Sequence, residues 1–264
     1  MLFLLIYTSS RVFLIATAGI TLIGAWEWSR LMGIKHLLWR YVYVALIAYI
    51  LFSMLFVYAP YVFFLALLAW ILASVLVIRY PIASTWWSKR PFWRGLMGCL
   101  VLIPCWMALN FIRNQPAGIT SLFALFILIW GADTAAYFVG RTWGKTKLAP
   151  TVSPGKSWEG LAGALVFALL WAVIILSFNP IVWSQAFSLS LLAVITVLFS
   201  VLGDLFESML KRQVGLKDSG RILPGHGGLL DRIDSLTAAA PIFALGMVLL
   251  NHCVKNSLIM IRLV

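Results

Sequence analysis

The sequence predicts an all-α, polytopic integral membrane protein with about eight membrane-spanning helices. Of its 264 residues, 63% are hydrophobic and only 11% are charged, whereas soluble globular domains carry about 25% charged residues. Apolar runs of nearly 20 residues recur along the chain, the length at which a helix crosses a hydrocarbon layer of about 30 Å. These runs do not alternate apolar and polar residues, which argues against a transmembrane barrel.

Eight apolar runs are the candidate spans. The first is interrupted by Arg11, and it lacks both the preceding basic residue and the small-residue cleavage site of a signal peptide. In chain order, the expected spans are residues 2–25, 41–58, 60–78, 95–112, 118–139, 160–178, 187–207 and 236–252.

The basic residues predict the orientation of these spans. Alternate loops on one side hold 16 of the 20 Lys and Arg residues. Cytoplasmic loops are enriched in Lys and Arg, so this side is expected to face the cytoplasm and the protein to lie in the cell inner membrane. The net charge of +12 follows from this topology and from attraction to anionic lipid, and it does not indicate a nucleic-acid partner. Cys99, Cys105 and Cys253 form no C-x-x-C pair and are expected to be packing residues.

The acidic residues divide the chain by chemistry. Only Glu27 precedes position 133, and the other seven acids lie between residues 133 and 234. We therefore expect residues 1–117 to form amino-terminal spans and an anchor. Residues 118–264 are expected to form the catalytic region, with cytoplasmic loops at 140–159 and 208–235.

Two aspartates are expected at or near membrane depth. Asp133 lies near the cytoplasmic end of its span, and Asp204 begins a polar stripe with spacings that place its members on one helical face. The stripe consists of Ser200, Asp204, Glu207, Ser208 and Lys211. A carboxylate in a span costs about 2.5 to 3.5 kcal/mol, so it usually faces a polar site. A salt bridge between Asp204 and a neighbouring Lys is the alternative.

The loop at 140–159 contains two GK[ST] sequences but no P-loop. Val139 and Pro150 stand where a Walker A motif requires glycine. Lys156 and Ser157 precede a predicted helix, whose first backbone N–H groups favour an anion. A plain helix cap at Ser157 remains equally open.

The loop at 208–235 combines cations, glycines, a histidine and aspartates within a short stretch. We expect Asp204 and Asp231 to converge on Mg²⁺, which takes one or two carboxylates from a protein and its other ligands from phosphate and water. Cations around such an ion suit phosphoryl or nucleotidyl transfer. Asp234 and His226 each have an alternative to a role in the site. Asp234 would then be a favourable charge at a helix start, and His226 would make a structural hydrogen bond.

The same residues resemble a known family. The elements Ser208-x-x-Lys211-Arg212, Lys217-Asp218-x-Gly220, His226-Gly227-Gly228 and Asp231-Arg232-x-Asp234 match the pattern of phosphatidate cytidylyltransferase, also called CDP-diacylglycerol synthase. The block from Asp133 to Gly160 and the triplet Trp26-Glu27-Trp28 are also similar to that family.

This resemblance implies a reaction of CTP with phosphatidate that gives CDP-diacylglycerol and diphosphate. The lipid phosphate would attack the α-phosphate of CTP in line, assisted by Mg²⁺ with a K⁺ beside it, as in the family. Asp204, Asp231 and Lys156 would be catalytic, and Asp133 would be a third metal ligand or an orienting group. The expected substrate-binding residues are Lys211, Arg212, Lys217, Ser157, His226, Gly227, Gly228 and Arg232.

The expected partners are CTP, phosphatidate and the lipid bilayer, and a homodimer stays open. Two other enzymes remain as alternatives, a cytidylyltransferase for archaeal ether lipids and a CTP-dependent polyprenol kinase. A transporter would use the buried aspartates as ion sites, but it predicts broken helices near the bilayer midplane. The acids here lie near one interface instead.

Overall fold

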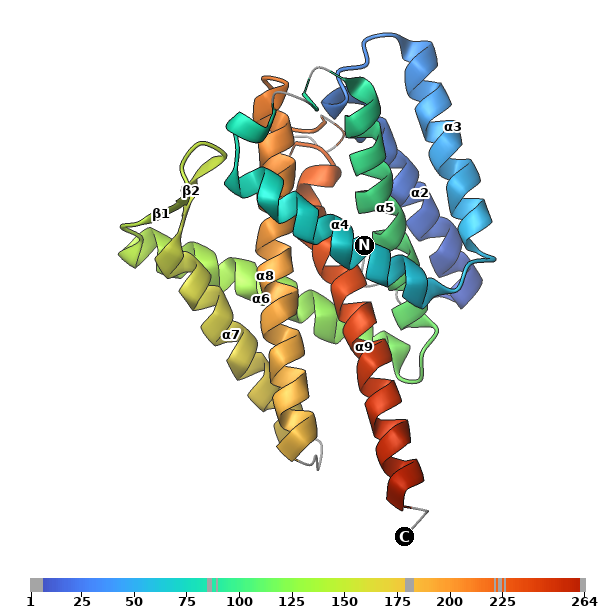
Figure 1. The fold of residues 1–264 in the computed structure, drawn as a ribbon, viewed down its shortest axis with the longest axis vertical. Helices are drawn as coiled ribbons and strands as arrows, with labels where there is room; N and C mark the ends of the chain where they lie inside the picture. Colours follow the sequence, from blue (N-terminus) through green and yellow to red (C-terminus); the bar gives the residue numbers. More distant parts are fainter. Residues whose placement is uncertain are drawn as a thin grey trace.

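Long helices make up most of the chain (Figure 1). The structure, a computed structural model, describes residues 7–84, 87–88, 90–178, 183–220, 222, 225 and 227–261. Its long helices are α2 (Ser10–Leu31), α3 (Leu37–Met54), α4 (Ala59–Ile78), α5 (Pro91–Arg113), α6 (Gly118–Trp143), α7 (Trp158–Ser177), α8 (Trp183–Gln213) and α9 (Asp234–Ile261). Their order matches the order of the eight expected spans.

The short elements all lie between these helices. They are the 3₁₀ helices η1 (Ile82–Ser84) and η2 (Leu230–Arg232) and the strands β1 (Lys147–Ala149) and β2 (Ser153–Ser157). The two strands pair antiparallel, with Lys147 opposite Ser157. Both GK[ST] sequences therefore lie in or beside a hairpin, and this differs from the strand, loop and helix order of a P-loop.

The prediction of a polytopic helical membrane protein is confirmed. Among the described residues, the seven helices from α2 to α8 are long and apolar enough to cross a membrane, and α9 is apolar over residues 234–250. The first span differs from the expected 2–25, because α2 begins at Ser10 and Arg11 lies in its first turn. The Ser9 hydroxyl accepts a hydrogen bond from the Val12 N–H at 3.4 Å, so Ser9 caps this helix start.

The outer helices present apolar side chains to their surroundings. On α7, Val166, Leu169 and Val173 are each about half exposed. In water such a continuous apolar surface would promote association, whereas hydrocarbon solvates it well. This exposure therefore fits helices that face lipid.

Helix α5 forms the centre of the bundle. It is the most enclosed of the candidate spans, 72% buried against 17% for α3, and it packs against α2, α4 and α9. Buried hydrogen bonds join it to α2 near both ends. Trp28 Nε1 donates to the Arg94 carbonyl at 2.8 Å, and Asn110 Nδ2 donates to Thr17 Oγ1 at 3.1 Å. In an apolar bundle such bonds fix the relative position of neighbouring helices.

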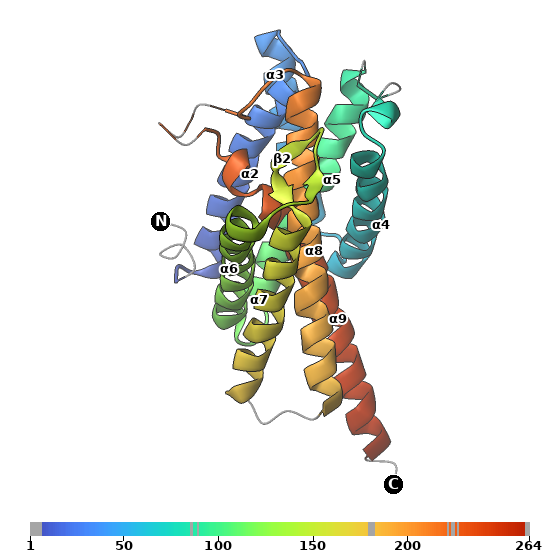
Figure 2. The same cartoon turned by 90° about the vertical axis from the view of Figure 1, so that its left-hand side faces the viewer.

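The expected basic loops gather toward one end of the molecule. Figures 1 and 2 show the segments that join α2 to α3, α4 to α5 and α8 to α9 at the same end, with the β1–β2 hairpin toward it. The α3–α4 and α5–α6 connections lie toward the other end. Figure 1 also shows α6 crossing α8 steeply, and the two helices are in contact.

Candidate active site

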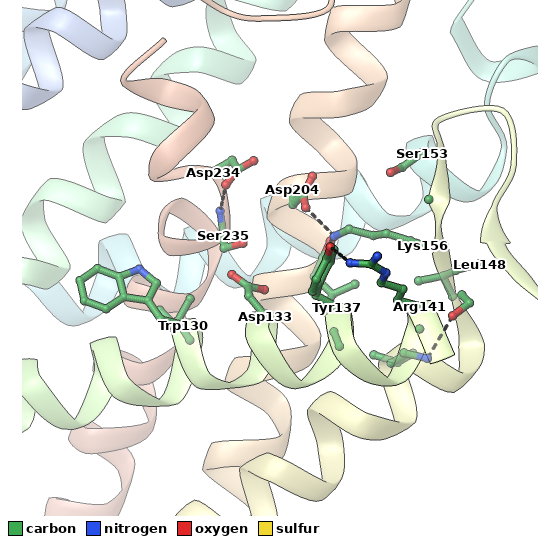
Figure 3. A pocket seen from close by; sticks show the side chains of 18 of the residues that line it. Trp130, Asp133, Tyr137, Arg141, Leu148, Ser153, Lys156, Asp204, Asp234 and Ser235 are labelled. Atoms are coloured by element: carbon green, nitrogen blue, oxygen red, sulfur yellow. Dashed lines mark hydrogen bonds and ion pairs between the residues drawn. The ribbon is translucent and has the colours of Figure 1, made fainter. Parts of the chain in front are cut away.

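A cavity of about 880 Å³ lies between α6, the β1–β2 hairpin, the start of α7, α8 and the segment from η2 into α9. Four aspartates line it: Asp133 on α6, Asp204 on α8, Asp231 on η2 and Asp234 at the start of α9. Figure 3 shows Asp133, Asp204 and Asp234 facing a common space. The fold thus brings together acids that are up to 101 positions apart in the sequence.

Helix α6 supplies one wall of the cavity from a single face. Trp130, Asp133, Tyr137 and Arg141 are spaced three, four and four residues apart and all line the cavity. Figure 3 shows Trp130 on one side of the acidic cluster and Arg141 on the other. Arg141 Nη1 donates a hydrogen bond to the Tyr137 hydroxyl at 3.0 Å. The wall therefore presents an aromatic, an acidic, a second aromatic and a cationic side chain in turn along one helix.

Lys156 contacts the cavity from β2. Its Nζ lies 2.7 Å from Asp204 Oδ2, and it also donates to the Val201 carbonyl at 3.5 Å. Both side chains keep some exposure, 23% for Lys156 and 30% for Asp204. The salt bridge considered as an alternative for Asp204 is therefore present, and it lies inside the cavity that the functional interpretation requires.

The polar stripe on α8 forms as expected. Ser208 Oγ donates to Asp204 Oδ1 at 3.2 Å, and Lys211 Nζ lies 3.3 Å from Glu207 Oε1. Asp204 lines the cavity, whereas Lys211 is not among its lining residues. The Lys211 ammonium points instead to Asp231 Oδ1 at 2.7 Å.

Asp231 accepts hydrogen bonds from several groups of the loop before it. Its carboxylate receives the Lys211 ammonium at 2.7 Å, the Ser219 N–H and hydroxyl each at 3.0 Å, and the Gly228 N–H at 2.8 Å. Burial acts to raise the pKa of Asp231, but Lys211 and the Gly228 N–H outweigh it and lower the pKa to about 2. Asp231 is therefore ionised at neutral pH and fixes the conformation of its loop.

Of the other expected site residues, some line the cavity and some lie outside it. Ser157 and Arg232 line the cavity, and Ser157 also caps α7, because its hydroxyl accepts the Gly160 N–H at 3.1 Å. Arg212 Nε donates to the Val152 carbonyl at 3.3 Å and so joins the end of α8 to the hairpin. Lys217 is exposed.

The structure explains why glycine occupies two positions of the loop. Gly227 has φ +83°, and a Cβ there would lie 2.9 Å from Asp231 Oδ2. The N–H of Gly228 is one of the donors to Asp231. His226 lies outside the described residues.

Sequence reasoning left two structurally important acids out of the site. Glu27 on α2 accepts hydrogen bonds from Leu229 and Leu230 just before Asp231. Glu159 in the first turn of α7 accepts the Thr146 N–H at 3.1 Å and holds the hairpin. For Glu27 the available signal was its isolation as the one acid of the first half of the chain.

The carboxylates of the cavity suit a hard cation. Within the described residues, no group of three His, Cys, Asp or Glu side chains has the spacing of a complete metal site. Mg²⁺ does not need one, since it commonly binds one or two carboxylates together with substrate phosphates and water. Three carboxylates that face one space in Figure 3, with the Lys156 ammonium on one of them, fit this kind of site.

Comparisons with known proteins agree with these features. The model of the cytidylyltransferase family matches residues 1–250. A Pseudomonas aeruginosa protein named phosphatidate cytidylyltransferase is 46% identical over 235 residues, which cover 88% of this chain and 86% of that protein. Proteins of the same name are 41% identical in Haemophilus influenzae, covering 88% of both chains, and 40% identical in Bacillus subtilis, covering 64% of this chain and 63% of that one. The chain therefore belongs to the cytidylyltransferase family, whose members are nucleotidyltransferases.

Proposed function

We propose that this protein transfers CMP from CTP to phosphatidate and releases CDP-diacylglycerol and diphosphate. The observation that carries the proposal is one cavity in which an acidic cluster and Lys156 lie between the aromatic side chain of Trp130 and the cation Arg141. The relatives named phosphatidate cytidylyltransferase, which match most of the chain, support the same reaction.

The mixed lining of the cavity suits a lipid phosphate and a nucleotide together. Apolar side chains from α6, α7 and α9, among them Phe126, Leu161 and Leu236, share the cavity with Arg141 and Lys147. A triphosphate requires cations around its oxygens, whereas the glycerol and acyl part of a lipid requires apolar contact.

The chemistry requires positioning more than proton transfer. The phosphate monoester of phosphatidate is largely ionised at neutral pH, so no strong base has to activate it. One of its oxygens forms a bond to the α-phosphorus of CTP, while the bond from that phosphorus to the diphosphate oxygen breaks and the electron pair leaves with diphosphate. Lys156 and Arg232, which line the cavity, would hold phosphate oxygens during this step. Arg212 and Lys217 do not line the cavity, so they would contact only phosphates that extend beyond it.

We assign Mg²⁺ to Asp204 and Asp231, as the sequence predicts, with Asp133 and Asp234, which face the same space as Asp204, as further ligands or orienting groups. A K⁺ is the second expected cation. When bound, Mg²⁺ offsets the charge that develops on diphosphate. Asp204 is suited to this role because its carboxylate has one ammonium contact and one hydroxyl contact. Asp231 is more heavily hydrogen-bonded, so Lys211 would share this carboxylate with the metal.

The membrane orientation belongs to the same proposal. The basic linkers that lie at one end of the bundle support a site that opens to the cytoplasm from the inner membrane.

Product identification tests the reaction. Purified protein in detergent micelles, supplied with CTP and phosphatidate, should form CDP-diacylglycerol and diphosphate in equal amounts, and a chelator of divalent ions should abolish the turnover. Release of CDP would reject the proposal in favour of a lipid kinase. Preference for an ether-linked acceptor would assign a different lipid.

A further inference from the structure

A buried glutamate connects α2 to the loop that carries the signature residues. Glu27 is 1% exposed. Its Oε1 accepts the Leu229 N–H at 3.1 Å, its Oε2 accepts the Leu230 N–H at 2.8 Å, and Oε2 also lies 3.2 Å from Ser219 Oγ. Ser219 is 192 positions from Glu27 in the sequence, and Leu230 is 203 positions from it. The contact therefore joins two segments that are far apart in the sequence.

The loop itself supplies the hydrogen bonds that this carboxylate needs. Among the residues that the structure describes, no Lys or Arg forms an ion pair with Glu27. A buried carboxylate is stable only where hydrogen bonds replace its hydration. The conformation of the loop and the burial of Glu27 therefore depend on each other.

Two glycines leave the space that Glu27 occupies. A Cβ on Gly220 would collide with Glu27 Oε1, and a Cβ on Gly228 would lie 2.7 Å from the same oxygen. Neither position has room for a side chain while Glu27 is in place. These glycines of the signature pattern are thus explained by the approach of α2 as well as by the loop.

Ser219 relays the contact toward the cavity. Its hydroxyl lies 3.2 Å from Glu27 Oε2 and 3.0 Å from Asp231 Oδ2, and its single proton can be donated to only one of them at a time. Asp231 in turn holds the Lys211 ammonium at 2.7 Å. Arg30, one helical turn beyond Glu27, fixes the same loop residue by donating to the Ser219 carbonyl at 3.2 Å.

We infer that Glu27 is a positioning residue of the active site. Its carboxylate holds Ser219 and the first residues of η2 together, and in this way it sets where Asp231 and Lys211 stand relative to the substrate phosphates. The inference rests on the proposed cytidylyl transfer and extends its site into α2, which lies outside residues 118–264.

The test is Glu27→Gln, which preserves the shape of the side chain but replaces one acceptor oxygen with a donor. Because hydrogen bonds to a charged group are lost, kcat/KM for CTP should fall about tenfold or more. Ser219→Ala should also lower kcat/KM for CTP. The fold decrease in the double variant should be smaller than the product of the two single fold decreases, as expected for groups that act through one another.

Thr17→Val is the matched control, since it removes a buried hydrogen bond of the same helix that does not reach the loop. It should lower Tm and leave kcat and KM within about twofold of the wild type, because its contact lies between α2 and α5. Unchanged kinetics in Glu27→Gln would overturn the inference. The inference would also be overturned if Glu27→Gln and Thr17→Val lowered Tm equally and lost equal amounts of kcat/KM.

Two further measurements cover the remaining outcomes. If Glu27→Gln does not accumulate, Arg30→Gln should reduce kcat/KM for CTP at least about threefold, and an unchanged value would overturn the inference. The increase in Tm that CTP with Mg²⁺ produces in the wild type should be smaller in Glu27→Gln. This binding measurement needs no turnover, so it separates a failure of the inference from a failure of the proposed reaction.

Discussion

Two lysine–aspartate pairs of equal length differ in burial. Lys156–Asp204 and Lys211–Asp231 both measure 2.7 Å, but their side chains are 23% and 30% exposed in the first pair and 12% and 9% in the second. A partly exposed pair costs little to open, whereas removing one partner of a buried pair leaves an uncompensated charge. We therefore expect Lys156 to exchange Asp204 for substrate phosphate and Lys211 to remain in place.

Lys156→Ala should impair the reaction with little effect on folding. The loss of one charged contact to phosphate should reduce kcat/KM for CTP by about 10-fold to 100-fold, while Tm changes by only a few degrees. Steady-state kinetics of the purified variant provide the measurement. The control is Lys35→Ala, an exposed lysine between α2 and α3. An equal loss in both variants would mean that Lys156 contributes only general surface charge.

The metal assignment predicts that Asp204 and Asp231 both set the Mg²⁺ requirement of the enzyme. Asp204→Asn should raise the Mg²⁺ concentration needed for half-maximal activity about 10-fold or more, because a carboxylate ligand is lost. Asp231→Asn should do the same if Asp231 binds the metal. A higher KM for CTP with an unchanged Mg²⁺ requirement would show that Asp231 acts only by holding Lys211. Titration of activity with Mg²⁺ at saturating CTP distinguishes the two roles.

The lowered pKa of Asp231 predicts that the stability of the protein depends on pH. Its pKa is lowered from 3.8 to about 2 in the folded protein. Its contribution is therefore complete above about pH 4 and is lost as the pH falls through about 2. Asp231→Asn should have a lower Tm than the wild type at pH 7, and the difference should shrink below pH 4. A difference that stays constant between pH 7 and pH 3 would contradict this expectation.

At the scale of elements, close packing of α8 on α9 brings Asp204 and Asp234 to one cavity. A Cβ on Gly203 would lie 2.5 Å from the Asp234 carbonyl and 3.1 Å from Ala238 Cβ. Glycine is required here because two helix backbones approach each other, as small residues allow in membrane bundles. The hairpin is attached in a different way, through the Glu159 carboxylate and the Ser157 cap at the start of α7.

Gly203→Ala should therefore lower stability. Overpacking at this contact should cost about 1 to 3 kcal/mol and lower Tm, and activity should fall with it because α8 and α9 separate. Gly19→Ala is the matched control, since it lies in α2 with nothing within 4 Å of its added Cβ. Helix propensity predicts that this control is neutral or slightly stabilising. Thermal unfolding in detergent measures both variants, and equal Tm values would contradict the packing argument.

At the scale of the whole molecule, alternating linkers separate a basic end from a mainly uncharged one. Lys35 lies in the α2–α3 connection and Tyr58 in the α3–α4 connection, and each can be replaced by cysteine. Introduced into a cysteine-free background, Lys35→Cys should react with an impermeant thiol reagent only from the cytoplasmic side, and Tyr58→Cys only from the opposite side. Labelling of intact cells and inverted vesicles measures this, and the reverse result would invert the topology.

Much of this organisation could be predicted from local properties of the sequence. Span number, helix order and the common basic end follow from composition and run length, because each depends on how a segment is solvated. The stripe from Ser200 to Lys211 follows from helical period alone, and within it Ser208 contacts Asp204 and Lys211 contacts Glu207. The first span was misplaced because the cap at Ser9 is a weaker signal than hydrophobicity.

The tertiary structure decided which charges meet. Nothing local indicates that Asp204 pairs with Lys156, that Lys211 points to Asp231, or that Glu27 holds a loop about 200 residues away. Such contacts depend on the packing of β2 against α8 and of α2 beside η2, and these are set by side-chain shape over the whole bundle. The sequence by itself determined which residues are chemically able to act, and only packing determined which of them act together.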